Sequence, residues 1–512
     1  MVQGTASSVG KSLLAAALCR VFARTGLRVA PFKSQNMSNN AAAISGGSEI
    51  GRAQYFQALA ARAEPRVEMN PILLKPESDA RSQVILNGKP FGIFSAADYY
   101  TLKPLLWKEV ARACTILGET ADLLVIEGAG SPAEINLASS DIVNMTVARY
   151  LGAPVILVAD IDPGGVFAQV VGTLALLSDE DRALVRGIII NKFRGDMSLL
   201  EPGIVMLEDL TGLPVLGVVP MLTGLNLPDE DGAAIKCGKA ADGSAGILSG
   251  GGRLDIAVIK LPHIANFDDF DPLASEASVE LRFVRKPEDL GRPDVIILPG
   301  TKSTISDLIW LKERGFDDGI RWLARTGTAV VGICGGFQML GDTIDDPDGV
   351  EGRGGAMAGL GLLPADTVFC HDKKVSPRRG RIAPYLGGRL VPLSGIEIEG
   401  YEIHCGETRV KGSAFALLGS DGSEIPDGAW SPDGGVWGTY MHDIFSSDGF
   451  RVAWLASLGA GAMVASRKAA LDASIDALAD AVEAALDMKR LREIIGLDGV
   501  VPIGREIIDE QA

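Results

Sequence analysis

The pattern of apolar and polar positions divides the chain into two α/β parts and a helical tail. In residues 1–220, short apolar runs alternate with stretches whose apolar side chains recur every three or four positions. The runs predict strands at 28–31, 123–126, 155–159, 187–190 and 215–219, and the periodic stretches predict helices at 11–24 and 49–62. Runs that are apolar throughout suit strands covered on both faces, so we predict an α/β fold with a doubly wound, mostly parallel sheet.

A glycine-rich segment separates this first part from the second. Residues 241–252 contain five glycines and no periodic apolar face, and we interpret them as a linker, with a long surface loop as the alternative. Apolar runs then return and predict a second α/β domain, with strands at 254–261, 295–298, 329–333 and 435–440. We therefore expect domains at 1–240 and 253–450, followed by a helical extension at 451–512.

The tail from about Ser466 to Leu497 is rich in alanine and predicts helices. Its apolar residues recur at spacings of three and four: Leu471, Ile475, Leu478, Val482, Leu486. A membrane-surface helix has such a stripe, and so does a helix that packs on its own protein, which is the interpretation we adopt.

Charge and composition restrict the possible binding partners more than they restrict the fold. The 512 residues include 48 lysines and arginines against 65 aspartates and glutamates, which gives a net charge of −17. That balance argues against nucleic-acid binding and against an anionic membrane surface. No apolar run approaches the roughly 18 residues of a membrane span, and the six cysteines show no regular disulfide spacing. We expect a cytoplasmic protein that binds small molecules and holds no structural metal, with a homo-oligomer left open.

The first chemical signal is a phosphate-binding loop at residues 4–12, Gly-Thr-Ala-Ser-Ser-Val-Gly-Lys-Ser. In such a loop the backbone amides surround a phosphate, the lysine reaches the terminal phosphates and the hydroxyl binds Mg²⁺. The loop is a variant, because its first glycine comes one residue early and Thr5 holds the usual place. Only residues 1–3 precede it, so either the first strand is very short or the true start lies upstream. The alternative is a ligand-free helix start. The candidate ATP ligands here are Gly4, Thr5, Ser7, Gly10, Lys11 and Ser12.

Polar residues follow the predicted strands where an open α/β sheet binds its ligands. Glu127 ends one strand and, with Ser12, is a candidate for Mg²⁺; Asp160 and Asp162 end the next strand. Asn191 follows a third strand and is placed to meet a nucleotide base. Each acid alone could equally cap a helix, but polar strand ends in series behind a phosphate loop favour a nucleotide site.

The second signal is a cysteine at a sharp turn between a strand and a helix. Residues 329–341 read Ala-Val-Val-Gly-Ile-Cys-Gly-Gly-Phe-Gln-Met-Leu-Gly, which predicts that Cys334 lies at a helix N-terminus where thiolate is favoured. A buried, inert cysteine is the alternative. A nucleophilic thiolate needs a base, and we choose His442, with His404 as the second candidate. The amides of Gly300 and Gly335 could form an oxyanion hole.

The cysteine segment resembles the nucleophile motif of class I glutamine amidotransferases, and Gly-Thr-Tyr-Met-His442 resembles their histidine segment. In that class a glutamate stands two residues after the histidine, and here the position is Ile444. The third triad member is therefore missing from its usual place, as in the cobyrinic/cobyric acid branch of the class.

The first half resembles dethiobiotin synthetase-like ATP-dependent domains. Residues 31–40 (Pro-Phe-Lys-Ser-Gln-Asn-Met-Ser-Asn-Asn), 49–54 (Glu-Ile-Gly-Arg-Ala-Gln) and 70–76 (Asn-Pro-Ile-Leu-Leu-Lys-Pro) resemble the cobyric acid synthase family more than its a,c-diamide relatives. The resemblance implies ATP- and glutamine-dependent amidation of the b, d, e and g carboxylates of adenosylcobyrinic acid a,c-diamide. It also implies Glu49 as a further Mg²⁺ ligand. The corrinoid candidates are Lys33, Gln35, Asn36, Asn39 and Lys75.

Three other interpretations stay open at this point. A partitioning-type P-loop ATPase would carry an extra lysine five residues before Lys11, where this chain has Ala6, and would not explain Cys334. A sister amidotransferase acting on the a and c carboxylates would differ in residues 33–40. A binding-only amidotransferase domain would not need both an intact cysteine and an intact histidine.

Overall fold

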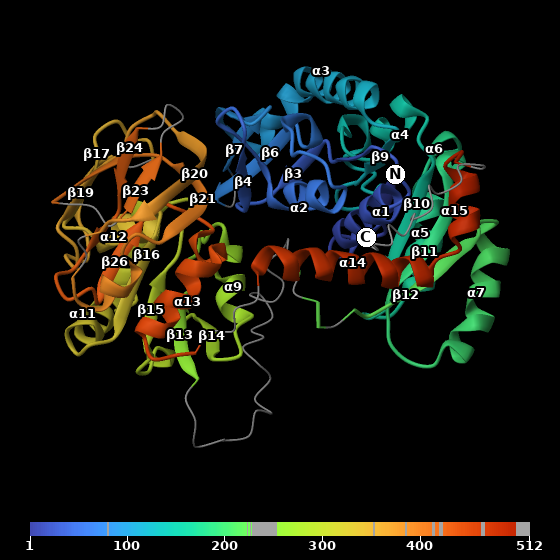
Figure 1. Ribbon diagram of the computed structural model, residues 1–512. Helices are drawn as coiled ribbons and strands as arrows, with labels where there is room; N and C mark the ends of the chain where they lie inside the picture. Colours follow the sequence, from blue (N-terminus) through green and yellow to red (C-terminus); the bar gives the residue numbers. More distant parts are fainter. Residues whose placement is uncertain are drawn as a thin grey trace, which may run out of the picture.

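The computed structural model shows two α/β domains joined side by side (Figure 1). It describes residues 1–78, 81–222, 224–225, 227, 253–351, 354–384, 387–411, 415–418, 423–461 and 466–497. The predicted linker at 241–252 lies outside the described residues. No helix among the described residues is long and apolar enough to span a membrane.

The first domain is built on parallel strands, as predicted. One sheet has the order β1-β10-β11-β12, and β2 pairs with β9 beside it, linked through a bridge between Val2 and Glu127. These strands are β1 (Val2–Gly4), β2 (Val29–Phe32), β9 (Leu123–Ile126), β10 (Val155–Asp160), β11 (Val185–Phe193) and β12 (Val215–Pro220). β1 is only three residues long, and it is fully buried beside β10.

Helices follow most of these strands. They are α1 (Lys11–Ala23), α2 (Arg52–Ala60), α3 (Ala96–Thr120), α4 (Met145–Leu151), α5 (Val166–Leu176), α6 (Asp179–Leu184) and α7 (Met197–Thr211). The helix expected at 49–62 starts late, because residues 48–51 form β5 (Ser48–Gly51), which pairs with β4 (Ala41–Ile44).

A smaller sheet in the first domain has no counterpart in the sequence predictions. Its order is β3-β6-β7-β8, and only the β3–β6 pair is parallel. Its strands are β3 (Gln35–Met37), β6 (Ile72–Ser78), β7 (Arg81–Leu86) and β8 (Lys89–Ser95). Polar residues interrupt these strands, so they lack the continuous apolar runs that mark a central parallel strand.

The second domain repeats the parallel design. Its main sheet has the order β14-β13-β15-β16-β26-β25, antiparallel only at the last pair. The strands are β13 (Leu254–Ile259), β14 (Val279–Val284), β15 (Val295–Leu298), β16 (Ala329–Ile333), β25 (Ala429–Trp430) and β26 (Val436–Thr439). The helices are α9 (Asp271–Ala274), α10 (Thr304–Glu313), α11 (Phe316–Arg325), α12 (Gly335–Leu340) and α13 (Asp448–Ser457). The predicted α/β class is therefore confirmed in both halves.

Two further sheets cover one side of the second domain. One has the order β18-β17-β19-β22 and the other β21-β20-β23-β24. Their strands are β17 (Thr343–Asp346), β18 (Gly355–Ala358), β19 (Ala365–Val368), β20 (Lys374–Ile382), β21 (Glu397–His404), β22 (Glu407–Val410), β23 (Phe415–Leu418) and β24 (Glu424–Asp427). β20 and β21 face the first domain (Figure 1).

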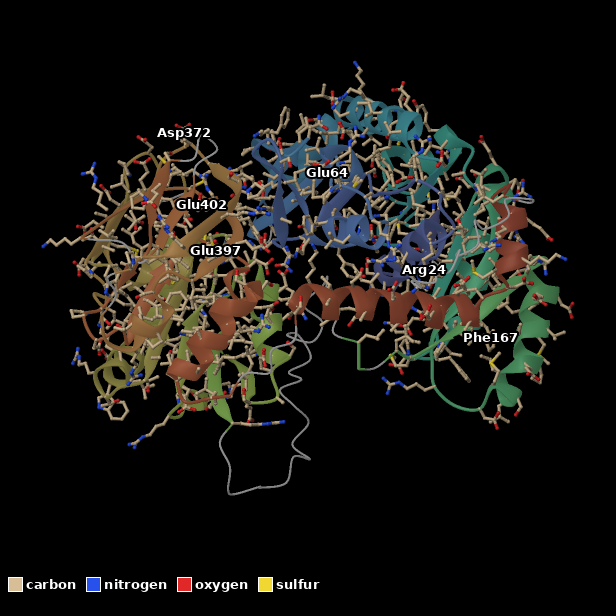
Figure 2. All side chains as sticks on the ribbon, viewed as in Figure 1. Arg24, Glu64, Phe167, Asp372, Glu397 and Glu402 are labelled. Atoms are coloured by element: carbon tan, nitrogen blue, oxygen red, sulfur yellow. The ribbon has the colours of Figure 1, made fainter. Side chains whose placement is uncertain are left out.

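The tail returns to the first domain. Its helices are α14 (Arg467–Ala485) and α15 (Met488–Ile494), and Ile475, Leu478 and Val482 are buried in an apolar cluster with α1. Arg24, which directly follows α1 and lies beside α14 in Figure 2, donates to Asp480 at 2.6 Å. The stripe therefore packs on the protein, as expected. α13, in contrast, packs on the second domain, where its aromatic side chains surround Trp437.

The two domains meet through polar and apolar contacts near the Cys334 turn. Lys302 of the second domain lies 2.8 Å from Glu77 of the first. Tyr401 and Ile403 of β21 pack against apolar residues of the first domain: Ala41, Ala43, Leu73 and Ile85. The interface thus contains the strand that ends beside the cysteine.

Candidate active sites

The loop at residues 4–12 has the form of a phosphate cradle. It leaves β1, and Gly10 adopts φ 96° just before α1 begins. A side chain at Gly10 would lie 2.2 Å from the Asn191 amide nitrogen, so only glycine fits there. Lys11 is buried, and its ammonium donates to the carbonyls of Ala6 and Gly130 at 2.9 and 3.0 Å. The lysine therefore lies across the loop, where a terminal phosphate would meet it.

Ser12 and Glu127 lie together beneath this loop, as the sequence predicted. The Ser12 hydroxyl donates to Glu127 Oε1 at 2.8 Å, and Gln57 of α2 donates to Oε2 at 2.6 Å. Lys33, which we expected at the corrinoid, instead donates to Oε1 of Glu127 at 2.8 Å. The carboxylate is therefore the centre of a polar cluster at the phosphate end of the pocket.

The remaining predicted nucleotide ligands lie in the loop or contact it. Ser7 lines it, while Thr5 donates its hydroxyl to Gln169 at 3.3 Å. Gly4 lies directly under the Lys11 ammonium, because a Cβ atom added at Gly4 would be 2.9 Å from that nitrogen. The amide of Asn191 donates to the Val9 carbonyl at 2.8 Å, so it supports the loop backbone from below.

Cys334 occupies a strained turn at the start of α12. Its φ of 52° and ψ of −110° are unusual for a residue with a side chain. A side chain at Gly336 would meet the Leu298 carbonyl oxygen at 2.0 Å, so the glycines after the cysteine let α12 approach β15 closely. The Cys334 amide donates to Thr439 of β26 at 2.8 Å, which brings the cysteine strand next to the strand leading to His442.

His442 is paired with a carboxylate from a distant part of the chain. Its Nδ1 lies 2.7 Å from Asp269 Oδ2, and both side chains are buried. The ring also hydrogen-bonds the Cys334 side chain. Burial alone would lower the pKa of His442, but the charges of Asp269 and Cys334 raise that pKa to about 10. At neutral pH the histidine is therefore an imidazolium beside the Cys334 sulfur.

Asp269 completes a Cys-His-Asp arrangement that the sequence analysis missed. It lies on a 3-10 helix, η3 (Phe267–Phe270), after β13, and its other oxygen accepts from the Asp443 amide at 2.8 Å. The only local sequence signal is the pair of adjacent acids, Asp268 and Asp269, which stands between two phenylalanines in the segment Asn-Phe-Asp-Asp-Phe. The carboxylate that pairs with His442 is therefore Asp269 of η3, and not a residue at position 444.

His404, the second candidate base, lies in the same cavity with different partners. Its Nδ1 donates to the Gly406 carbonyl at 3.2 Å, and its ring stacks on Tyr440 at 3.7 Å. Burial first, and then the Lys374 charge, lower the pKa of His404 to about 3. The His404 ring is therefore neutral at neutral pH and has a carbonyl as its partner, whereas His442 pairs with Asp269 and hydrogen-bonds Cys334. His442 stays our candidate for the proton carrier of the cysteine.

The predicted oxyanion residues lie on either side of the cysteine. A side chain at Gly300 would meet the His442 ring at 2.8 Å, and one at Gly335 would meet Thr301 at 2.7 Å. Gly300 therefore lets the turn after β15 approach His442, and Gly335 lets the Cys334 turn approach Thr301. Their amides as an oxyanion hole stay a prediction.

The cavity of Cys334 is built by both domains. Besides Cys334 and His442, it is lined by three residues from the first domain: Asn39, Lys75 and Gln83. Asn39 and Lys75, which we expected to hold the corrinoid, thus lie beside the cysteine.

Glu49 lies with this group and away from the polar cluster at Glu127. Its carboxylate pairs with Lys75 at 2.6 Å and with Lys373 of the second domain. Burial opposes the charge, but Lys373 and Lys75 lower the pKa of Glu49 to about 2. The resemblance made Glu49 a metal ligand, whereas in the structure both of its oxygens bind lysines across the domain interface.

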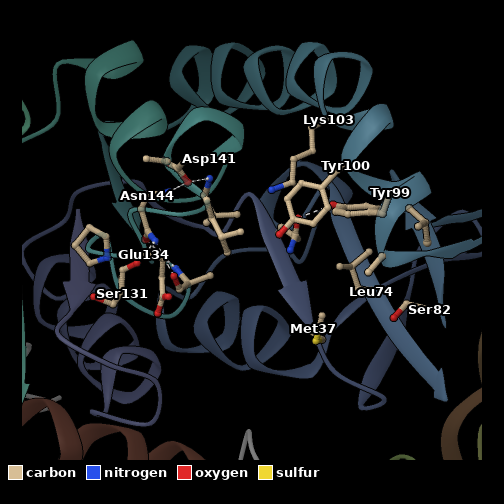
Figure 3. A pocket seen from close by; sticks show the side chains of 18 of the residues that line it. Met37, Leu74, Ser82, Tyr99, Tyr100, Lys103, Ser131, Glu134, Asp141 and Asn144 are labelled. Carbon is tan, nitrogen blue, oxygen red and sulfur yellow. Dashed lines mark hydrogen bonds between the residues drawn. The ribbon is translucent and has the colours of Figure 1, made fainter. Parts of the chain in front are cut away.

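A large cavity adjoins the phosphate pocket. Its volume is about 630 Å³, and it shares Gln35, Met37 and Ala129 with that pocket. Apolar and aromatic side chains, among them Leu74 and Tyr99, form much of the wall, and Lys103 lies at its edge (Figure 3). Of the expected corrinoid ligands, Gln35 lines this cavity and accepts from the Tyr99 hydroxyl.

Asn36 is placed differently from Gln35, although the two are adjacent. Its side chain is buried, lines the phosphate pocket and donates to Gln54 at 3.0 Å. The five expected corrinoid residues therefore belong to three neighbouring sites: the carboxylate cluster, the large cavity with its phosphate pocket, and the cavity of Cys334.

Fold and site together define an ATP-dependent glutamine amidotransferase. The family model described as the CobQ/CobB/MinD/ParA nucleotide binding domain matches residues 1–234, and the CobB/CobQ-like glutamine amidotransferase domain matches residues 255–450. A cobyric acid synthase of Sorangium cellulosum is 51% identical over 97% of this chain and 98% of its own. One of Moorella thermoacetica is 49% identical over 97% of each chain. The chain belongs to the cobyric acid synthase family.

Solved structures match one domain at a time. A crystal structure of a glutamine amidotransferase covers 40% of this chain and 98% of its own, with 19% identity and a TM-score of 0.29. The MinD cell division protein of Aquifex aeolicus covers 44% of this chain and 82% of its own, with 11% identity and a TM-score of 0.25.

Proposed function

We propose that this chain amidates the b, d, e and g carboxylates of adenosylcobyrinic acid a,c-diamide, with glutamine as the nitrogen donor and ATP as the activator. The observation that carries the proposal is the joint construction of the two centres. The cavity with Cys334 and His442 is lined also by Lys75 of the domain that bears the phosphate loop. Nitrogen released at the sulfur would therefore emerge against the domain that activates the acid.

At the glutaminase centre the Cys334 thiolate attacks the side-chain carbonyl of glutamine. The bond from that carbon to nitrogen breaks, His442 gives its proton to the departing ammonia, and a thioester remains on the sulfur. Water then attacks the thioester, His442 takes up a proton from that water, and glutamate leaves. Asp269, at 2.7 Å from Nδ1, holds the ring with its other nitrogen toward the sulfur throughout.

At the phosphate centre a corrinoid carboxylate attacks the γ-phosphorus of ATP, which gives an acyl phosphate and ADP. Ammonia then displaces phosphate from the acyl carbon and forms the amide. Lys11 lies where it would neutralise charge on the transferred group, since its ammonium is held across the loop by carbonyls at 2.9 and 3.0 Å.

The residues beneath the loop fit a magnesium ion. The Ser12 hydroxyl and the Glu127 carboxylate are hard oxygen donors 2.8 Å apart, and Mg²⁺ is usually held by one or two such groups together with phosphates. Bound there, the ion would neutralise phosphate charge. Among the described residues, no group of three or more His, Cys, Asp or Glu side chains is arranged around a metal position.

The cavity of about 630 Å³ is the place we assign to the corrinoid. A corrin ring is broad and largely apolar at its faces, which suits walls such as Leu74 and Tyr99. Its carboxylates lie at the ring edge, where Arg81 and Lys103 offer positive charge. Because the cavity shares Gln35 with the phosphate pocket, one edge carboxylate can reach the loop while the others stay at the rim.

We also infer that the protein works in the cytoplasm. The described cysteines are all free: Cys19, Cys114, Cys334, Cys370 and Cys405. A reactive cysteine and free thiols suit a reducing compartment.

Mass spectrometry of the corrinoid tests the proposed substrate. Incubation of adenosylcobyrinic acid a,c-diamide with the protein, ATP and glutamine should convert four carboxylates to amides in succession. Lys11→Ala should lose this conversion with either glutamine or ammonium as nitrogen source, because acyl activation precedes the use of nitrogen. An unchanged corrinoid with the wild-type protein, or full turnover by Lys11→Ala, would contradict the proposal.

A further inference from the structure

The carboxylate that orients His442 lies on a segment held by the other domain. Segment 266–269 begins with Asn266, whose φ of 51° is left-handed, and leads into η3. The Asn266 amide donates to Asn40 Oδ1 at 2.8 Å, and the Ala41 amide donates to Asn266 Oδ1 at 2.9 Å. These reciprocal bonds attach the start of the segment to residues 40–41 of the synthetase domain.

The middle of the same segment is held by Arg52, the first residue of α2. Its guanidinium Nε lies 2.5 Å from Asp268 Oδ2, and Nη2 lies 3.6 Å from Asp443. Asp268 and Asp443 are each the chain neighbour of a glutaminase residue, Asp269 and His442 respectively. From the synthetase domain, Arg52 therefore contacts both of the segments that carry Asp269 and His442.

Tyr401 lies between Arg52 and the ring of His442 and contacts both. The Tyr401 ring stacks on the His442 ring at 5.3 Å, with 19° between their planes. The Arg52 guanidinium lies 5.8 Å from the centre of the same tyrosine ring. Asp269 thus lies at the edge of the imidazole, and Tyr401 lies at its face. Arg52 contacts Asp268, the chain neighbour of Asp269, and also lies near the Tyr401 ring.

The same two residues of the synthetase domain also belong to its phosphate pocket. Arg52 and Asn40 both line that pocket. On the same helix, Gln57 donates to Glu127 at 2.6 Å and to the Ser12 carbonyl at 3.3 Å. One short helix thus contacts the carboxylate beneath the phosphate loop at one position and the segment of Asp269 at another.

We propose that Arg52 and Asn40 are positioning residues of the glutaminase centre, which hold segment 266–269 so that Asp269 orients His442. Neither touches the reacting atoms. Because both also line the phosphate pocket, a nucleotide and an acid bound there act on the rate of glutamine hydrolysis through α2 and residues 40–41. This coupling limits the loss of ammonia when no acid is ready for amidation. The inference rests on the proposed function, and its test separates the two.

The test compares two nitrogen sources in the full chain. In Arg52→Gln, kcat for glutamine hydrolysis should fall about 100-fold, because small misplacement of a catalytic group has effects of that size. The KM for glutamine should change little, since Arg52 does not line the cavity of Cys334. Arg52→Lys should recover part of this loss, since it restores one positive charge. An unchanged kcat for glutamine hydrolysis in Arg52→Gln would overturn the proposal.

Two further variants keep the test decisive. Asp268→Asn removes the same ion pair from the other domain, at a residue that does not line the phosphate pocket. It should lower glutamine hydrolysis while ammonium-dependent amidation stays within about threefold of wild type, and a parallel loss with both nitrogen sources would overturn the proposal. Arg28→Gln is the matched control, because Arg28 pairs with Asp122 at 2.5 Å entirely within the synthetase domain. It should leave both nitrogen sources unchanged. Normal glutamine hydrolysis in Asp268→Asn would contradict the assignment.

The coupling has its own measurement. With wild-type protein, glutamate release should be faster with ATP and the corrinoid than without them, and in Arg52→Gln the two rates should be equal. Wild-type hydrolysis that ignores ATP and corrinoid would contradict the coupling. Amidation with ammonium, measured in the same samples, reports separately whether the proposed function itself holds.

Discussion

Two histidines share the cavity of Cys334, and their surroundings give them opposite properties. His442 and His404 are both buried, and each stacks on a tyrosine. The Nδ1 atom of His442 meets the carboxylate of Asp269, whereas that of His404 meets the Gly406 carbonyl. Burial lowers the pKa of both, yet the Asp269 charge brings the pKa of His442 to about 10 while that of His404 falls to about 3.

The comparison shows that a charged partner, more than burial, decides which of the two rings carries a second proton at neutral pH. Burial removes water from both rings and so disfavours the imidazolium in both. Of the two rings, that of His442 has a carboxylate that offsets this cost. His404, with its Nδ1 hydrogen directed to a carbonyl, keeps a neutral ring that can shape the cavity.

The largest effect should come from His442→Gln. This change removes the proton carrier from the sulfur and should lower glutamine-dependent amidation by about 1,000-fold or more. Ammonium-dependent amidation should be close to wild type, since acyl activation occurs in the other domain. A steady-state assay of amide formation with both nitrogen sources checks this, and equal losses would remove His442 from the glutaminase centre.

Asp269→Asn should have the next largest effect, about 100- to 1,000-fold on glutamine hydrolysis, because the ring loses its orientation and its countercharge. Without the carboxylate, the pKa of His442 falls below about 10, because burial still lowers it while Cys334 alone still raises it. The positive charge beside the sulfur is then reduced at neutral pH, so alkylation of Cys334 by iodoacetamide at pH 7 should be slower in the variant than in wild type. A rate at pH 7 equal to that of wild type would show that Asp269 does not set the charge of His442.

His404→Gln should lower glutamine-dependent amidation less than tenfold, as expected for a residue that shapes a pocket without carrying protons. The change should appear mainly in the KM for glutamine. A loss of kcat as large as that of His442→Gln would exchange the roles of the two histidines.

The smallest kinetic effects should come from removing the hydroxyl groups of Tyr440 and Tyr401, and the two substitutions should differ. The Tyr440 hydroxyl accepts from Gln338, which lines the cavity of Cys334, at 3.1 Å, and it also hydrogen-bonds the Thr408 hydroxyl. Tyr440→Phe should therefore raise the KM for glutamine about threefold, the cost of a modest hydrogen bond. The Tyr401 hydroxyl has no hydrogen-bond partner among the described residues, and Tyr401→Phe keeps the ring that stacks on His442. Its kinetics should match wild type. A larger effect of Tyr401→Phe than of Tyr440→Phe would contradict this view of the stacking.

Features that depend on neighbouring residues could be predicted from the sequence. The strands at 123–126, 295–298 and 329–333 have those bounds in the structure, because continuous apolar runs mark buried parallel strands. The approach of Ser12 and Glu127 followed from the rule that the carboxyl ends of parallel strands meet at one edge of the sheet. The turn at Cys334 followed from its flanking glycines.

Features that depend on packing between distant parts of the chain could not be predicted from the sequence. Asp269 reaches His442 from a loop 173 residues earlier in the chain, and no spacing rule predicts that approach. Lys75 and Glu49 seemed to belong to the substrate and the metal, but the docking of the second domain brings Lys373 and the Cys334 cavity to them. Helix α2 starts three residues later than expected because β5 pairs with β4, a contact that hydrophobic periodicity does not report.

The central claim is that nitrogen is released at one centre and used at another. Cys334→Ala tests it most directly, in an assay that follows the corrinoid by mass spectrometry with ATP and either glutamine or a high concentration of ammonium. The account predicts no amide with glutamine and four successive amides with ammonium. An inactive variant with both nitrogen sources, or normal amidation with glutamine, would contradict it.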